Sequence, residues 1–424
     1  MPASPSTARV INDRLALRLL QQEGPLTAGQ LKQFTGLSRP TVADLVERLT
    51  AAGLVAVVGE SGEQRRGPNA RLYGIVADRA HLAALDVRTE GVSVLVADLL
   101  GGVLAEASVP IGGDTGTGPA VEQAVALVES AAKEAGAAPL HTVGIGAPGL
   151  IDPATGELRD SSGLPEWHRR LVTALHERLP ARVIVENETN LAALAEQREG
   201  AARDRDTFVL LWLGHGTGAA VVLDGALRRG ASGGTGEIGF LPVPGTRTLP
   251  SATDCEGGFH SLAGSGAIAQ LAGEYGLFTG DTGGEPQAAV LVRRAVEAVT
   301  RSEAAAVAPA AEAVRATAAG AGRPASDLRP EEARRFLDAL ADRLAIGAAS
   351  LAAILDPGCV VLGGEVGQAG QDVLAARVEA RLARMSPLVT EVRAGVLGGG
   401  AVLRGALLTA RDGAQDEIFA PPAR

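Results

Sequence analysis

The sequence predicts an α/β protein in which an N-terminal winged helix-turn-helix precedes a larger body of alternating strands and helices. Residues 1–80 contain short capped helices followed by two strands around a basic turn, and from residue 81 onwards apolar strands alternate with amphipathic helices. The body also uses the same opening twice, a strand, a tight turn and a second strand. This repeat indicates two half-domains around a cleft.

The length and composition limit the classes of protein that fit. A chain of 424 residues is too long for one ordinary hydrophobic core, so two or three domains are expected. No run of about 18 uncharged apolar residues occurs and the first residues lack the apolar stretch of a secretion signal, which predicts a cytoplasmic protein. Cys255 and Cys359 lie far apart and indicate neither a disulfide framework nor a sulfur-rich zinc site.

The net charge of −10 is unevenly distributed along the chain. Residues 1–80 hold ten Arg or Lys and seven Asp or Glu, whereas the rest of the chain holds 29 basic and 42 acidic residues. A basic N-terminal unit on an acidic body is expected if only that unit meets a polyanion. The excess of positive charge is mild, so charge alone does not distinguish this interpretation from chance.

Three predicted helices make up most of the N-terminal unit. The first covers VINDRLALRLLQQEG, in which apolar residues recur at helical spacing. The second, TAGQLKQFTG, opens with Thr27 and Gln30 as a capping box and stops at Gly36. The third, LSRPTVADLVERLTAAG, has Ser38 as its N-cap and Pro40 in its tolerant first turn. A helix, a glycine-containing turn and a second capped helix form a helix-turn-helix.

A predicted hairpin after the third helix completes a winged arrangement. The segment LVAVVGESGEQRRGPNARLYGI gives a strand, a glycine-rich basic turn and another strand. In this arrangement the start of the third helix enters the major groove while the wing meets phosphates. The predicted DNA-binding residues are Ser38, Arg39, Pro40, Thr41, Asp44, Arg48, Arg65, Arg66 and Arg71. Among them, Arg39, Thr41 and Asp44 are expected to face base edges, and Arg48 and the wing arginines are expected to face phosphates. The alternative is a bundle that docks another protein.

The body places polar residues and glycines at the ends of its predicted strands. ALDVRTEGVSVLVADLLG gives a strand ending at Asp86, a charged turn and a second strand, and RVIVENETNLAALAEQREG ends a strand on Glu186-Asn187-Glu188 and begins a helix. The scheme restarts at DTFVLLWLGHGTGAAVVLDGALRRG, which has three glycines in its bend. Such glycines either let backbone N–H groups close around a phosphate or serve only the tight turn.

Four ordered motifs after the winged helix resemble the ROK family, which groups bacterial sugar-responsive repressors with sugar kinases. The motifs are GIGAPGLID, VENETNLAALAE, GHGTGAAVVLDGALRRGASGGTGEIG and DPGCVVLGGEV. The resemblance runs over essentially the whole chain and implies a two-lobed, actin-like ATPase fold. The units it implies are a winged helix-turn-helix at 1–80, a first lobe at 81–198 with a C-terminal helix at about 400–412, a second lobe at 199–399 and a loose tail at 413–424.

The chain departs from the family's kinases at two catalytic positions. Those kinases place an acid and several glycines after the first strand, whereas here Asp86 is followed by Val87-Arg88-Thr89-Glu90, whose extra negative charge would repel a triphosphate. Their catalytic base is the Asp of an Asn-Asp pair, which is Asn187-Glu188 here and sets the carboxylate one methylene further out. A displacement near 1 Å can cost about a hundredfold in rate. We therefore predict no enzyme activity, no catalytic residue beyond the degenerate base position Glu188, and no cofactor.

The sugar-binding and zinc motifs that the resemblance implies are also altered. GEIGF retains Glu237 but has Phe240 where the family has His, and TDCEGGFHSLAGS has Ser261 where a second Glu belongs. The expected zinc ligands fall on Asp254 and Phe259, and one neighbouring thiol and one histidine do not make a four-ligand site, so no metal is predicted.

Five positions remain as candidate ligand contacts in the cleft between the lobes. They are Gly149, Asn187, Glu188, Glu237 and His260. Simpler interpretations stay open for three of them. In these interpretations Asn187 and Glu237 are hydrogen-bonded supporting residues, and His260 is a satisfied loop histidine.

Two functions from different classes follow from these residues. The first is a DNA-binding transcriptional regulator of sugar-metabolism genes, expected to be a repressor, in which a sugar or sugar phosphate changes lobe closure. Closure would then alter the spacing of two winged helices in a homodimer or homotetramer on a palindromic operator. The second is an active ATP-dependent sugar kinase with an N-terminal appendage. The glycine-poor turn and the substitutions at Glu188, Phe240 and Ser261 argue against the kinase.

Overall fold

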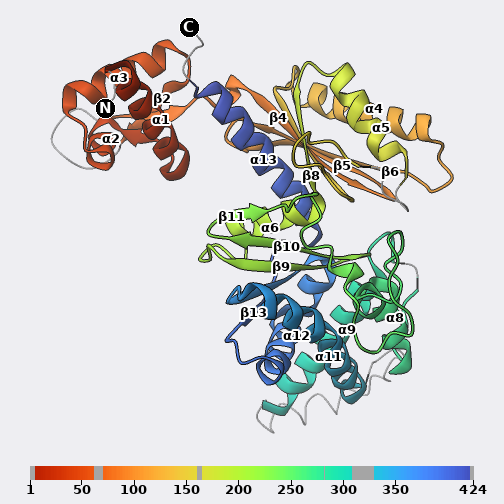
Figure 1. Ribbon diagram of the computed structural model, residues 1–424. Coiled ribbons are helices and arrows are strands. Elements are labelled where there is room, and N and C mark those ends of the chain that lie inside the picture. The colour runs from red at the N-terminus through yellow and green to blue at the C-terminus, as the bar shows by residue number, and fades with distance from the viewer. Residues whose placement is uncertain (1–4, 62–69, 160–164, 281, 308–328, 421–424) are drawn as a thin grey trace, which may run out of the picture.

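The structure is a computed structural model, and it describes residues 5–61, 70–159, 165–280, 282–307 and 329–420. A small N-terminal domain lies beside the first of two lobes, and the second lobe lies below them in the view of Figure 1. In the part of the chain described, no helix is both long and apolar enough to cross a membrane.

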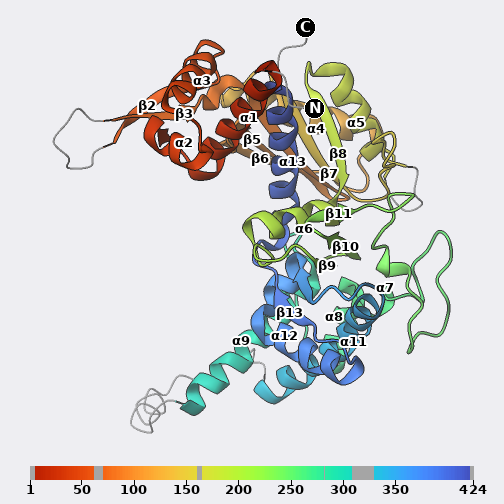
Figure 2. The same cartoon turned by 60° about the vertical axis from the view of Figure 1, so that its left-hand side comes forward.

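The N-terminal domain is a winged helix-turn-helix, as predicted. Its elements are α1 (Pro5–Glu23), β1 (Leu26–Thr27), α2 (Ala28–Thr35), α3 (Arg39–Ala51), β2 (Val55–Ser61) and β3 (Ala70–Ile75). The three strands form one antiparallel sheet in the order β1-β3-β2. The β2–β3 hairpin projects away from the rest of the molecule (Figure 2). Arg65 and Arg66, predicted at its tip, lie outside the described residues.

Local capping accounts for the two helices of the motif. Thr27 and Gln30 form the predicted capping box at the start of α2, and Gly36 ends that helix in the left-handed conformation with a φ of 68°. Ser38 caps α3, where its Oγ accepts a hydrogen bond from the backbone N–H of Thr41 at 3.3 Å. The apolar face of α3 is buried, which fixes which side of the helix is left for contacts with other molecules.

The first lobe is built on a five-stranded mixed sheet. Its strands are β4 (His81–Arg88), β5 (Gly91–Asp98), β6 (Val103–Pro110), β7 (Thr142–Ala147) and β8 (Arg182–Asn187), in the order β6-β5-β4-β7-β8. Helices α4 (Thr117–Glu134) and α5 (Trp167–Arg178) cover one face. The C-terminal helix α13 (Ala401–Ile418) packs on β4 and β7 from the other face.

The second lobe repeats this sheet plan. Its strands are β9 (Phe208–Leu213), β10 (Thr217–Leu223), β11 (Ala226–Arg228), β12 (Cys359–Gly363) and β13 (Glu391–Ala394), in the order β11-β10-β9-β12-β13. In both sheets the first three strands are antiparallel and the last two join in parallel to the first. This shared order confirms the predicted duplication and the two-lobed fold.

Helices bury one face of the second sheet, and one helix is shared between the lobes. The helices of this lobe are α7 (His260–Ala263), α8 (Ser265–Glu274), α9 (Gln287–Val307), α11 (Pro330–Leu355) and α12 (Gly364–Met385). Helix α6 (Glu188–Glu199) packs on β10 of the second lobe and on α13 of the first. It therefore lies at the junction of the two lobes.

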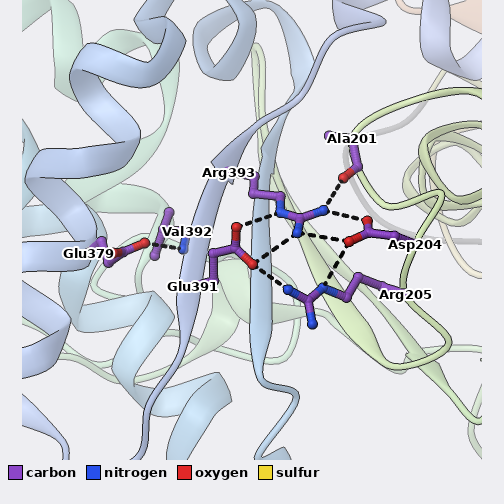
Figure 3. Close-up of polar contacts among 7 residues, drawn as sticks. All are labelled: Ala201, Asp204, Arg205, Glu379, Glu391, Val392 and Arg393. Atoms are coloured by element: carbon purple, nitrogen blue, oxygen red, sulfur yellow. Dashed lines mark hydrogen bonds and ion pairs between the residues drawn. The ribbon is translucent and has the colours of Figure 1, made fainter.

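A cluster of charges holds the segment after α6 against the edge strand β13 (Figure 3). Arg393 donates to Asp204 Oδ1 at 2.6 Å and to the carbonyl oxygen of Ala201 at 2.8 Å. Arg205 donates to Glu391 Oε2 at 2.5 Å, and Glu391 also accepts from Arg393 at 2.8 Å. Because these residues come from both segments, the C-terminal end of α6 is fixed to the second lobe.

Helix α13 corrects the predicted tail. We expected a helix at about 400–412 followed by a loose segment at 413–424, but the helix continues to Ile418. The extra turns have partners: Ala414 is buried and Gln415 donates to the carbonyl oxygen of Leu99 at 2.9 Å. The sequence of this segment is polar, so contacts made only in the folded protein account for the longer helix.

The N-terminal domain shares a hydrophobic core with the first lobe and α13. Ala16, Leu17 and Leu20 of α1 are buried in the same cluster as residues of β4, β5 and α13. At the end of α13, the carbonyl oxygen of Phe419 accepts from Arg14 Nε at 3.4 Å. The winged helix is thus packed against the body, and both views show α1 beside α13 (Figures 1 and 2).

Candidate functional site

The first candidate site is the exposed start of α3. Ser38, Arg39 and Pro40 are solvent-exposed there, while Thr41 is half-buried and its Oγ1 lies 2.8 Å from the Oγ of Ser38. The Arg39 side chain at the helix N-terminus therefore has open space in front of it. Arg71 is exposed on β3, on the strand that leads back from the wing.

The structure shows that Arg48 makes ion pairs within the N-terminal domain. Its guanidinium donates to Asp13 Oδ1 of α1 at 2.6 Å and is also ion-paired with Asp44 one turn earlier on α3. The hydrogen bond with the Asp13 carboxylate is the main reason that the pKa of Arg48 is raised. Arg48 thus joins α1 to α3 by pairing with Asp13 and Asp44, and the DNA contacts of Arg48 and Asp44 stay predictions.

The second candidate site is a cleft of about 890 Å³ between the lobes. Its walls come from the turn after β7, the start of α6, the β9–β10 hairpin and the loop before α7. All five predicted ligand contacts line it: Gly149, Asn187, Glu188, Glu237 and His260. The size lies in the usual range for small-molecule pockets.

Asn187 is held by hydrogen bonds within the protein. Its Oδ1 caps α6 by accepting from the backbone N–H of Thr189 at 2.9 Å, and its Nδ2 donates to the carbonyl oxygen of Gly149 at 2.9 Å. Gly149 has a φ of 102°, in the left-handed region where glycine is favoured. Asn187 therefore ties the turn after β7 to the start of α6 and gives the cleft wall a fixed shape.

Glu188 lies in the cleft at the start of α6 and is partly buried. Burial raises its pKa to about 7, and the nearby carboxylate of Asp86 adds to this rise. The side chain is thus divided between its acid and carboxylate forms near neutral pH, and it can donate or accept a hydrogen bond.

Glu237 and His260 face the same space from the second lobe. Burial raises the pKa of Glu237 and lowers that of His260. At pH 7 the imidazole is therefore neutral, and it adds no positive charge to the cleft. Phe240, which replaces the histidine implied by the family resemblance, also lines the cleft and is partly exposed.

Several cleft residues were not predicted from the sequence. They are Leu150, Thr189, Trp212, Thr217, Thr235 and Cys255, together with glycines of the β9–β10 turn and of residues 233–239. Thr217 Oγ1 is buried and has no hydrogen-bond partner within the described part of the chain. For Trp212, the sequence offered one signal of a place in the cleft, which is its position two residues before Gly214 at the start of the three-glycine turn.

An arginine occupies the side of the cleft where the family resemblance places nucleotide phosphates. Arg88, at the end of β4, donates to Asp86 Oδ2 at 2.9 Å, to Glu365 Oε1 at 2.7 Å and to the carbonyl oxygen of Gly399 at 2.9 Å. Asp86 is buried, and Glu365 comes from the start of α12 in the second lobe. Arg88 therefore bridges the lobes and is the counter-ion that the two acids share.

A second ion pair crosses between the lobes beside the first. His215 Nε2, in the β9–β10 turn, lies 3.2 Å from Glu90 Oε1 in the β4–β5 turn. The hydrogen bond between them raises the pKa of His215 and lowers the pKa of Glu90 to about 2. The sequence did not indicate this pair, because the two turns are far apart in the chain.

The residues at the expected zinc loop do not fit zinc. Phe259, at one ligand position, is fully buried in the core of the second lobe, and Cys255 is a free cysteine at the cleft. Within the described ranges, no group of three or more His, Cys, Asp or Glu side chains is arranged to hold a metal ion.

Comparison with known proteins decides the family. Residues 83–412 match the model of the ROK family. The chain belongs to the ROK family. Residues 12–67, which include most of the winged helix-turn-helix, match the model of the MarR family.

The curated relatives that the chain matches include repressors of sugar metabolism. The chain is 25% identical over 237 residues to the xylose repressor of Caldicellulosiruptor bescii, an alignment that covers 55% of this chain and 59% of that protein. It is 27% identical over 241 residues to the DNA-binding transcriptional dual regulator NagC of Escherichia coli, an alignment that covers 55% of this chain and 57% of that protein. The chain thus spans less than two thirds of the length of either relative.

A solved ROK structure has the same overall architecture. The crystal structure of a ROK family transcriptional regulator, described as a homologue of the Escherichia coli MLC protein, superposes with a TM-score of 0.69. The match covers 97% of this chain and 98% of that one at 19% identity, so it establishes the fold alone.

Proposed function

We propose that this ROK protein is a DNA-binding transcriptional regulator of sugar metabolism that senses a sugar in the interlobe cleft. The observation that carries the proposal is that α1 shares a hydrophobic core with the first lobe and that Arg14 of α1 donates to the carbonyl oxygen of Phe419 at the end of α13, because these contacts connect the winged helix to the body that forms the cleft. The repressor function of the xylose repressor, and the DNA-binding regulation by NagC, support the same conclusion.

The route from cleft to DNA runs through two helices. The start of α6 lines the cleft, and α6 packs along α13, whose C-terminal end accepts a hydrogen bond from Arg14 of α1 through the carbonyl oxygen of Phe419. A ligand that binds one lobe arrangement more tightly shifts the population towards it. In a homodimer this shift changes the separation of two recognition helices and hence the fit to the half-sites of a palindromic operator. Such a regulator acts in the cytoplasm.

We further propose that the protein does not phosphorylate sugars. Glu188 alone does not decide this, because a carboxylate with a pKa of about 7 is a suitable general base. The phosphate side supports the proposal: Arg88 pairs with the carboxylates of Asp86 and Glu365, and a triphosphate would have to displace it and face those acids. An ADP-release assay with ATP, magnesium and a panel of hexoses, pentoses and amino sugars tests this. Turnover above roughly 1 s⁻¹ would contradict the proposal and support the kinase.

DNA binding is tested with the full chain and no assumed operator. Repeated selection from a random duplex library should enrich one sequence with two half-sites, and fluorescence anisotropy should give a tighter Kd for it than for a shuffled duplex. Glucose, xylose and N-acetylglucosamine are then added to the complex. Failure to enrich any sequence would overturn the proposal.

A further inference from the structure

We infer that the cleft accepts a sugar without an anionic group and excludes sugars that carry a phosphate or a carboxylate. This inference rests on the proposed sensing function and specifies the chemical class of the effector. It follows from the charges that line the cleft, from the ion pairs that surround it and from the contacts of its glycine turn.

The charged side chains in the cleft wall are acids. Glu188 and Glu237 both line the cavity, and its described lining includes no Arg or Lys. His260, the remaining titratable base in the wall, is neutral at pH 7 because burial lowers its pKa. Sugar hydroxyls can donate to the two carboxyl groups, whereas a phosphate oxygen has no cation to meet it.

The arginines that border the cleft are already paired with carboxylates. Arg229, whose carbonyl oxygen accepts from the lining residue Thr235, donates to Glu186 Oε2 at 2.6 Å. Arg159 is hydrogen-bonded through its backbone to the lining residue Leu150, and its guanidinium lies 2.6 Å from Asp152.

Arg88, on the side where the family resemblance places nucleotide phosphates, is paired in the same way. Its guanidinium lies 2.9 Å from Asp86 Oδ2 and 2.7 Å from Glu365 Oε1. Each bordering cation thus has its own acid. A phosphate could recruit one of them only by leaving that acid unpaired, and where the acid is buried this is costly.

The glycine turn of the second lobe does not offer a phosphate cradle either. A carboxylate oxygen of Glu365 already lies against Gly214, so that a Cβ atom at Gly214 would be 2.9 Å from it. The backbone N–H of Gly214 donates to the carbonyl oxygen of Gly216 at 3.0 Å. An anion approaching this turn would meet a carboxylate and an N–H that is already used.

Charge repulsion therefore sets the specificity. A phosphate monoester carries about 1.5 to 2 negative charges at pH 7. Placing it beside Glu188, which is divided between its acid and carboxylate forms near pH 7, and Glu237 in a partly desolvated cleft costs free energy, because each acid must either take up a proton or face a like charge. An uncharged sugar makes the same hydroxyl contacts without this penalty, so the site discriminates by repelling the alternative ligand.

Matched ligand pairs test the inference by calorimetric titration of the full chain. The pairs are glucose with glucose 6-phosphate, xylose with xylose 5-phosphate, N-acetylglucosamine with its 6-phosphate, and glucose with glucuronate. We expect a neutral member to bind, with its anionic counterpart more than about tenfold weaker. An anionic member that binds as tightly as its neutral counterpart, or more tightly, would overturn the inference and leave the sensing function standing. Failure of every sugar to bind would overturn the sensing function, and the inference with it.

Two substitutions assign the discrimination to the acids. Glu237→Gln and Glu188→Gln each replace an ionisable carboxyl group with a neutral amide that still forms hydrogen bonds, so the ratio of the two Kd values within a pair should fall several-fold. Glu106→Gln, at an exposed position on β6 outside the cleft, is the matched control and should leave the ratio unchanged. An unchanged ratio in both cleft variants would show that these charges do not determine the specificity.

Discussion

The guanidinium of Arg88 and the carboxylate of Glu365 form an ion pair of 2.7 Å across the two lobes, although the residues are 277 positions apart in sequence. The same guanidinium also pairs with the buried Asp86 of its own lobe. A built-in cation therefore links the lobes at the place where the family resemblance puts the phosphates of a nucleotide. The two lobes are thus joined by an ion pair between residues of the chain itself.

Arg88→Ala is expected to destabilise the protein and loosen the contact between the lobes. It leaves Asp86 and Glu365 without their counter-ion, and a loss of about 1–3 kcal/mol in the free energy of unfolding follows for this partly buried pair. Denaturant unfolding measures the loss in the free energy of unfolding. Small-angle X-ray scattering should show a larger radius of gyration, because the contact between the lobes is looser. Arg170→Ala breaks an exposed ion pair with Glu166 and serves as the control. Equal effects of the two substitutions would contradict a bridging role.

Glu188→Gln is expected to stabilise the protein, and more so at pH 8 than at pH 5. Its pKa is about 7 in the folded state against 4.5 for an ordinary Glu, so the folded state holds this proton more tightly than the unfolded chain does. Stability is therefore lost as pH rises between these two values, and above pH 7 the wild type carries the full cost of a partly buried charge. The gain at pH 8 should be on the order of 1–3 kcal/mol, measured from melting curves across pH. A gain that is equal at both pH values, or equal to that of Glu106→Gln, would show that Glu188 does not titrate in this range.

Local signals made the winged helix and the cleft walls predictable from the sequence. Ser38 and Thr27 cap their helices with hydrogen bonds to residues three positions away, so a short window contains the information. Asn187 and Glu188 follow a buried strand, and side chains at the ends of neighbouring parallel strands meet at one edge of a sheet. These residues therefore reached the cleft as expected.

Long-range pairing explains what the sequence did not reveal. Arg48 was expected to face phosphate, but its partner Asp13 is on another helix, 35 positions earlier. The partner of Arg88 lies in the other lobe. Likewise, the helix beyond residue 412 depends on Gln415 reaching Leu99. No local pattern encodes which distant charge or carbonyl group folds against such a side chain.

Gly144→Ala is expected to weaken the packing of α13 on the first lobe. A Cβ atom at Gly144 in β7 would lie 2.3 Å from the carbonyl oxygen of Ala406, so the helix or the strand must shift. We expect a loss of about 1–3 kcal/mol in stability. Gly266→Ala in α8 is the control, because a Cβ there has no neighbour within 4 Å and alanine favours the helix.

The same substitution also tests the route from cleft to DNA. If α13 transmits lobe closure, Gly144→Ala should reduce the change in DNA affinity caused by a sugar more than it reduces DNA affinity itself, as measured by anisotropy with and without the sugar. A normal sugar response in a destabilised Gly144→Ala protein would remove α13 from the route.

Arg39→Ala is expected to weaken binding selectively at the enriched DNA sequence, whereas Arg71→Ala should weaken binding to all duplexes. Arg39 is exposed at the start of the recognition helix, where a side chain reaches base edges, and a lost base contact costs about 1–3 kcal/mol at the cognate site. Arg71 lies on the wing strand, where a contact with phosphate does not depend on the DNA sequence. Loss of that contact should reduce the salt dependence of binding by about one counterion. Anisotropy titrations on cognate and shuffled duplexes at several salt concentrations separate the two effects. Arg48→Ala completes the comparison: because Arg48 bridges Asp13 and Asp44, it should lower the melting temperature. Equal losses on both duplexes for Arg39→Ala would show that this residue contacts the backbone and not the bases.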